Sequence, residues 1–84
     1  MMEYFYTQLI GKSVVSEHGD HIGILRKIYA DLEKGHLVYF GIECQNEEMR
    51  KIFKENDEGL LLVPTERVTS IKDFIVIRVY DRSL

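Results

Sequence analysis

Hydrophobic and polar residues alternate along most of this chain, in short runs separated by turn signals. The runs are rich in Val, Ile, Leu, Phe and Tyr and are about four to eight residues long, which suits half-buried β-strands better than helices. They are interrupted at His18-Gly19-Asp20, at Glu33-Lys34-Gly35 and at the single proline, Pro64. Glycine supplies the positive φ of tight hairpins, and a proline ends a strand because it has no backbone N–H. The pattern predicts a small curled sheet.

Five segments have the composition and alternation of strands, and the whole barrel is expected to contain about six. They are residues 13–16, 22–32, 36–44, 60–63 and 74–80. In the second segment Ile22, Ile24, Ile28, Ala30 and Leu32 share one phase and are predicted to face the core, whereas Tyr29 and Leu25 are assigned to a partly apolar second face. A bulge at Arg26 is expected to turn this arginine outward. The core-facing positions predicted in two other segments are Val38, Phe40, Ile42, Cys44, Ile75, Ile77 and Val79.

Three short helical segments are predicted within this all-β fold. Residues 46–54 place Met49, Ile52 and Phe53 on one helical stripe, and Asn46 is suited to cap the first turn. An extended excursion is the alternative interpretation of the same residues. Residues 65–68 are predicted to form one tight turn, and residues 7–11 another that closes one end of the barrel.

Size and charge limit what the chain can be. At 84 residues there is room for one domain, residues 1–84, and the 45% of apolar and 30% of charged residues are typical of a globular protein. The net charge of −3 opposes non-specific binding of nucleic acid, which depends on Lys and Arg at phosphates. The single cysteine excludes an intrachain disulfide, and no apolar run is long enough to span a membrane. A cytoplasmic location without direct membrane insertion is expected.

Neither the histidines nor the cysteine favour a chemical role. His18, Asp20, His21 and His36 could in principle ligate zinc, but zinc sites usually show tighter patterns such as paired cysteines, and these residue types are common in turns. Cys44 is interpreted as a small core side chain rather than a reactive thiol, because free cysteine is among the most buried residue types. No metal, cofactor or catalytic residue is expected.

The charged clusters are interpreted as solvated surface. Asp31 with Glu33, or Glu47 with Glu48, could suggest acid–base chemistry, but nothing predicts a dry cleft that would separate their pKa values. The basic residues that could contact RNA phosphates lie among acidic neighbours; they are Arg50, Lys51 and Lys54.

An apolar surplus is the best functional clue in the sequence. Aromatic residues cluster at the start of the chain, and the outer face of the last predicted strand is apolar as well. The residues concerned are Tyr4, Phe5, Tyr6, Phe74, Val76 and Tyr80. Two interpretations remain open, because the first group could cover the second within one monomer, or both could form an interface with another protein.

Placed in order, several segments resemble the PRC-barrel family. They are Leu9-Ile10-Gly11-Lys12, Val14-Val15, Gly19-Asp20-His21-Ile22-Gly23, Asp31-Leu32-Glu33-Lys34-Gly35 and Leu62-Val63-Pro64-Thr65-Glu66-Arg67-Val68. The resemblance covers about residues 7–80, and its specificity comes from the order of weak signals. One departure is Lys27, where many relatives carry an acidic residue.

The resemblance implies a docking module rather than a catalyst. The family includes the cytoplasmic part of the photosynthetic reaction-centre H subunit, the C-terminal half of the ribosome-maturation factor RimM, and small stand-alone proteins, some of them archaeal and associated with cell division. We therefore expect a non-catalytic adaptor that forms a homodimer and docks onto a larger cytoplasmic or membrane-associated protein complex. The alternative is a factor in ribosome maturation that resembles the PRC-barrel half of RimM.

Overall fold

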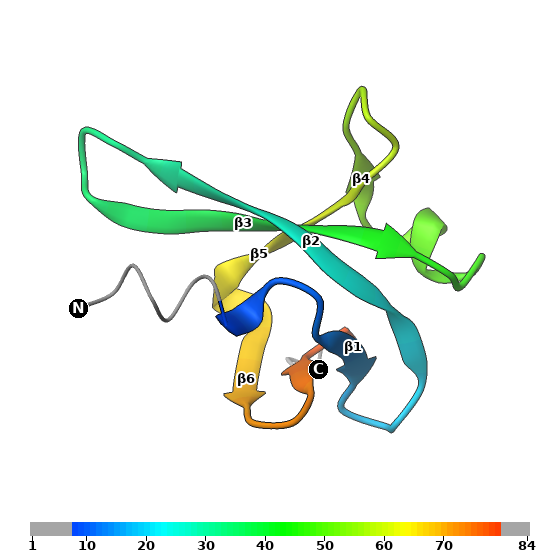
Figure 1. Cartoon of the computed structure of the whole chain (residues 1–84). Coiled ribbons are helices and arrows are strands. Elements are labelled where there is room, and N and C mark those ends of the chain that lie inside the picture. Colours follow the sequence, from blue (N-terminus) through cyan, green and yellow to red (C-terminus); the bar gives the residue numbers. More distant parts are fainter. Residues whose placement is uncertain (1–7, 80–84) are drawn as a thin grey trace, which may run out of the picture.

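The computed structural model describes residues 8–79, and their fold is a single seven-stranded sheet (Figure 1). The strands are β1 (Ser13–Ser16), β2 (His21–Asp31), β3 (His36–Cys44), β4 (Lys54–Glu55), β5 (Leu61–Pro64), β6 (Val68–Ile71) and β7 (Ile75–Ile77). Two 3-10 helices, η1 (Met49–Lys51) and η2 (Thr65–Arg67), connect them. The predicted all-β fold is confirmed, with one strand more than expected.

The strand order is β4-β5-β3-β2-β1-β7-β6, so β2 and β3 form the centre of the sheet. All neighbouring strands pair antiparallel except β1 and β7, which are parallel. The long β2–β3 hairpin reaches beyond the rest of the sheet (Figure 1). At its tip the Asp31 Oδ1 atom accepts hydrogen bonds from the backbone N–H groups of Glu33 and Lys34, and Gly35 has a φ of 71°. This turn role explains the acidic residue better than acid–base chemistry does.

Two irregularities bend β2 and change which of its residues face inward. Its pairing with β3 shifts register between Leu25 and Lys27, so the predicted bulge at Arg26 is confirmed. Its pairing with β1 also skips a residue at Ile22. Because each skipped residue reverses the inward phase, Leu25 lies in the core, and its predicted place on the opposite face, with Ile24 inward, is wrong. Ala30 and Leu32, predicted to share the inward phase, are exposed instead, because they lie at the end of the hairpin that reaches beyond the core (Figure 1).

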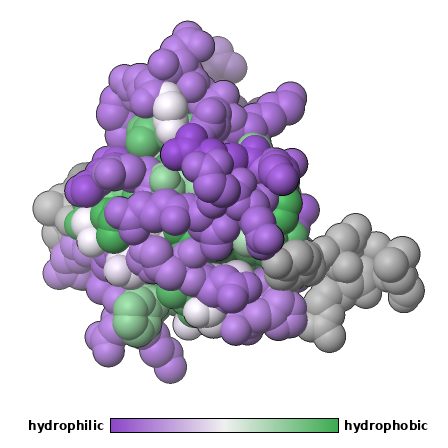
Figure 2. Space-filling view, turned by 90° about the vertical axis from the view of Figure 1, so that its right-hand side faces the viewer, coloured by the Kyte–Doolittle hydropathy of each residue, from purple (hydrophilic) through white to green (hydrophobic). Residues whose placement is uncertain are grey.

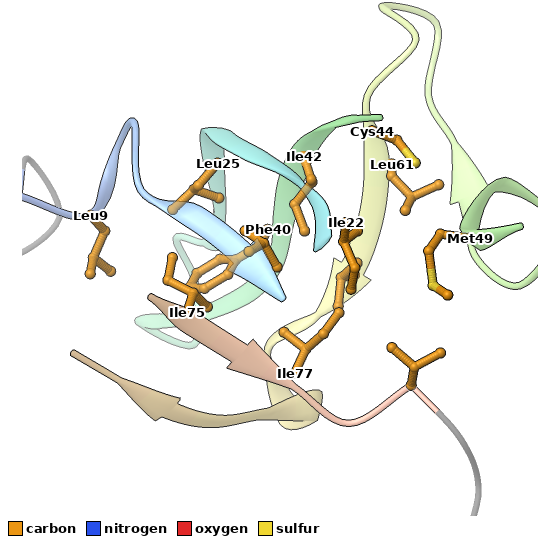
Figure 3. Close-up of a cluster of buried hydrophobic side chains, with 13 residues drawn as sticks. Leu9, Ile22, Leu25, Phe40, Ile42, Cys44, Met49, Leu61, Ile75 and Ile77 are labelled. Carbon is orange, nitrogen blue, oxygen red and sulfur yellow. The ribbon is translucent and has the colours of Figure 1, made fainter. Parts of the chain in front are cut away.

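The curled sheet encloses one apolar core (Figure 3). In that view Leu9 lies at one end and Met49 at the other, with Phe40, Ile75 and Ile77 between them. The buried apolar residues are Leu9, Val14, Ile22, Leu25, Phe40, Ile42, Cys44, Met49, Leu61, Val63, Ile75, Ile77 and Val79. The alternation predicted for the last strand and for Phe40, Ile42 and Cys44 is therefore confirmed, whereas Val38 is only half-buried.

The short helix predicted between residues 46 and 54 is present, but as a single 3-10 turn rather than an α-helix. Only Met49–Lys51 are helical, and the residues around them make successive bonds between each N–H and the carbonyl three residues earlier. A nine-residue segment is too short to be stable as an isolated α-helix. Of the predicted helical stripe, Met49 is buried in the core, whereas Ile52 is 45% exposed. Lys54, the last residue of the predicted helix, is the first residue of β4. Asn46 accepts a bond from the Glu48 N–H, forming a local turn rather than a helix cap.

Near the C-terminal end the predicted boundaries also change. The tight turn after Pro64 is confirmed as η2, but β6 was not predicted, because Val68-Thr69-Ser70-Ile71 is a short, half-buried edge strand with two hydroxyl residues. The last strand is shorter than predicted and covers Ile75–Ile77.

Candidate functional site

The outer side of β7 is the first apolar surface that the described residues form. In the register of the sheet Val76 lies between Val15 of β1 and Ser70 of β6, while its neighbours Ile75 and Ile77 are buried. Val15, Val76 and Ser70 therefore share the outer face, and all three are half-buried. Phe74 precedes the strand and is 53% exposed. We call Val15, Phe74 and Val76 the β7 face.

The β7 face contains two of the six residues that the sequence predicts as protein-binding. Phe74 and Val76 lie outside the core, as predicted. The other four, Tyr4, Phe5, Tyr6 and Tyr80, lie outside the described residues. Whether aromatic residues of one chain cover this face therefore stays an open prediction.

A second apolar surface lies on the outer side of β3 and β5. Tyr39 of β3 is directly opposite Pro64 of β5, and Leu62 shares their face. These three side chains, with Ile52, Phe53 and Lys54, line a half-open hollow of about 280 Å³. We call it the Tyr39 groove. Tyr39 is 39% exposed there, so the groove presents an accessible aromatic side chain.

A more polar hollow of about 330 Å³ adjoins the Tyr39 groove and shares Tyr39 and Pro64 with it. Its other lining residues are His36, Leu37, Val38, Thr65 and Glu66. The Thr65 Oγ1 atom donates a hydrogen bond to the Leu37 carbonyl, which joins η2 to β3 beside this hollow. The Tyr39–Pro64 pair thus lines both hollows.

Sequence reasoning missed the Tyr39 groove, although part of the signal was present. The phase that turns Phe40 inward also turns Tyr39 outward, but the sequence pattern placed Ile52 and Phe53 with Met49 on one stripe of a helix. Only the pairing of Tyr39 with Pro64 and of Lys54 with Leu62 brings these residues together.

Arg67 connects the Tyr39 groove with the end of the described chain. Its guanidinium carbon lies 5.8 Å from the centroid of the Phe53 ring, within the range of a cation–π contact. The Nη1 atom of the same guanidinium donates hydrogen bonds to the carbonyl oxygens of Arg78 and Val79, at 3.0 and 3.1 Å.

Two of the basic side chains on the sheet are engaged by carboxylates. Arg26 Nε lies 2.7 Å from Glu43 Oε1, and Lys27 Nζ lies 2.8 Å from Glu58 Oε1. The hydrogen bond to Glu58, together with the negative charge of this residue, raises the pKa of Lys27 above its ordinary value. Lys27 thus has a local ion-pairing role on the outer side of β2.

An ion pair also neutralises Arg50, one of the three basic residues in and near η1. Arg50 forms an ion pair with Glu55, and it lies 4.0 Å from the carboxylate of Glu47. Figure 2 shows a face on which hydrophilic residues predominate and hydrophobic ones form small, separate areas. Opposite charges placed this close lower the positive potential that a phosphate backbone would require.

The residues considered for metal or thiol chemistry have other contacts. His21 Nε2 shares a hydrogen bond of 2.8 Å with Gln45 Oε1, and His36 lies exposed at the start of β3. Within residues 8–79, no group of three or more His, Cys, Asp and Glu side chains is placed to hold a metal ion. Cys44 is buried, as predicted, and its Sγ atom donates to the Asn46 carbonyl oxygen at 3.0 Å.

A curled seven-stranded sheet with apolar side chains on its outer surface defines a small β-barrel module. The chain belongs to the PRC-barrel family, since the model of the PRC-barrel domain matches residues 1–83, essentially the whole sequence. Domains of this family are generally non-catalytic. No curated protein matches the chain. In the part of the chain that the structure describes, no helix is long and apolar enough to cross a membrane.

Proposed function

We propose that this protein is a non-catalytic protein-binding module that forms a homodimer through its β7 face and docks onto a larger protein complex. The observation that carries the proposal is the exposure of Phe74 beside Val15 and Val76, in a protein whose core is already filled by other side chains. Aromatic side chains that are buried on association dominate the binding energy of many interfaces.

The sheet supports this role because it holds the β7 face rigidly. β7 lies between β1 and β6, and its inner residues Ile75 and Ile77 are fully buried. A two-fold symmetric pairing would place the β7 face of one protomer against the same face of its partner. Association would remove the Phe74 ring from water at roughly 25 cal/mol per Å² of apolar surface. The surrounding charges would set the orientation of the partners.

A narrower form of the proposal names the complex. The stand-alone members of the family suggest a division or membrane-associated complex in an archaeal cytoplasm, with the homodimer as the adaptor. The ribosome-associated alternative is less well supported, because Arg26, Lys27 and Arg50 are each engaged by a glutamate.

Light scattering at several protein concentrations tests the dimer. We expect the unaltered protein to reach the mass of a dimer and Phe74→Ser to shift it toward the monomer. Leu32→Ser is the matched control, because Leu32 is 92% exposed at the tip of the β2–β3 hairpin, away from the β7 face. Circular dichroism establishes that both variants remain folded.

Two results would count against the proposal. A monomer at every concentration would exclude the homodimer, and a dimer unaffected by Phe74→Ser would remove the β7 face from the interface. Filter binding of RNA distinguishes the ribosome-associated alternative from the protein-binding proposal. The alternative predicts that the protein retains RNA on the filter at low salt and that the retained amount falls steeply as salt is added.

A further inference from the structure

The chain leaves the described structure at a fixed point next to the Tyr39 groove. The Val79 N–H donates to a carboxylate oxygen of Glu17 at 2.9 Å, and the Val79 carbonyl accepts from Arg67 at 3.1 Å. The guanidinium of Arg67 in turn lies over the ring of Phe53, which lines the groove. One guanidinium group therefore separates the Val79 carbonyl from the groove wall.

The next residues have the length and chemistry to fill this groove. Five residues, 80–84, follow Val79, and a fully extended chain of five spans at most ~17 Å. Their sequence begins with Tyr80 and Asp81. An aromatic ring suits a hollow lined by Tyr39, Phe53 and Pro64, and the adjacent carboxylate suits the cation of Lys54, which lines the same hollow.

The size of the groove also favours a side chain over a separate ligand. Small-molecule sites enclose roughly 300–1,000 Å³ and bury most of the ligand. The Tyr39 groove has about 280 Å³ and is open on one side, so it matches one aromatic side chain better. A tethered occupant needs little affinity, because a short linker holds it at millimolar effective concentration.

We propose that residues 80–84 of the same chain occupy the Tyr39 groove, with the ring of Tyr80 as the main contact. This assignment gives Tyr80 an intramolecular place in the Tyr39 groove, whereas the sequence left open whether Tyr80 is covered within one monomer or forms an interface with another protein. It is independent of the β7 face, because Phe74 and Val76 do not line the groove. The tail would then cover an apolar surface that would otherwise be available to other proteins.

Disulfide trapping in the full chain tests this inference. In a Cys44→Ser background, Ile52→Cys places a thiol in the groove and Arg82→Cys places one on the tail. We expect an intrachain disulfide to form at least about tenfold faster than in the control pair Leu32→Cys with Arg82→Cys, because docking raises the local thiol concentration. Adding Tyr80→Ser should reduce the faster rate to that of the control.

Each other outcome contradicts the proposal in a distinct way. Disulfide-linked dimers as the main product would show that the groove takes the tail of a second copy. Equal rates for both pairs, or a rate that does not respond to Tyr80→Ser, would show that the tail does not dock there. These outcomes leave the test of the β7 face unaffected, since that test relies on Phe74 alone.

Discussion

Replacing Gly23 by alanine is the sharpest test of how the two central strands pack. Gly23 is buried in β2, directly opposite Cys44 of β3. A Cβ atom at this position would lie 2.0 Å from the carbonyl oxygen of Glu43, which is a backbone atom and cannot rotate away. The strands would have to separate by about 1 Å to reach the 3.0 Å below which Cβ contacts essentially do not occur.

The expected loss follows from the hydrogen bonds next to this contact. An N–H···O bond that lengthens by about 1 Å leaves the usual range of roughly 2.7–3.2 Å, and the Gln45 N–H bond to the Ile22 carbonyl, at 2.7 Å, is directly adjacent. Each buried group left without a partner costs about 1–3 kcal/mol. Two such groups would lower the free energy of unfolding by about 2–6 kcal/mol. The less flexible unfolded chain of the alanine variant offsets about 0.4–1 kcal/mol, so we expect the free energy of unfolding to fall by about 3 kcal/mol in total. This is a large part of the stability of about 4–13 kcal/mol typical of such a chain.

Gly41→Ala is the matched control, because Gly41 is also a buried glycine of the same strand pair. The two nearest atoms to its Cβ would be the ends of side chains, Tyr29 at 3.0 Å and Leu60 at 3.2 Å, which can yield by a few tenths of an ångström, and the Lys27 Cβ at 3.4 Å is an ordinary contact. Urea unfolding followed by circular dichroism should show Gly41→Ala within ~1 kcal/mol of the unaltered protein. A fall in Tm of at least ~12 °C is expected for Gly23→Ala. The reasoning is refuted if Gly23→Ala is as stable as Gly41→Ala.

Two further predictions follow from single side chains. Because the pKa of Lys27 is raised in the folded state, its pairing with Glu58 contributes stability that is fully present below about pH 10.5 and is lost as the pH rises through the higher folded value. The difference in Tm between the unaltered protein and Lys27→Gln should therefore be constant from neutral pH to about pH 9 and shrink at higher pH; a difference that grows with pH would contradict this. Cys44 is buried, so Ellman's reagent should modify it only as fast as the protein opens, and its rate should rise steeply with added urea. Rapid modification without urea would show that the thiol is accessible.

Much of the fold could be predicted from the sequence because its strongest signals are local. The glycine turns and the single proline place the boundaries of β1, β2, β3 and β5 within a few residues. The alternation of Phe40, Ile42 and Cys44 assigns the inner face of β3, since a strand without bulges has only two faces. The bulge at Arg26 was detectable too, because a charged residue interrupts an otherwise apolar phase.

The apolar surfaces were harder to predict, because they depend on which strands lie side by side. Phe74 and Val76 could be placed on the outer face from the alternation of one strand. Val15 joins them only through the parallel pairing of β1 with β7, which connects distant parts of the chain. The Tyr39 groove likewise requires the register of β3 against β5, and no local pattern encodes that register.

The sequence by itself determined the strand-rich composition, the positions of the turns and the inward phase of the regular strands, because these depend on neighbours along the chain. Tertiary structure decided the inward position of Leu25, the replacement of the expected helix by a short 3-10 turn around Met49, and the two apolar surfaces. The reason is that a bulge, a short helical segment and a groove each gain their stability from contacts between strands that are far apart in the sequence.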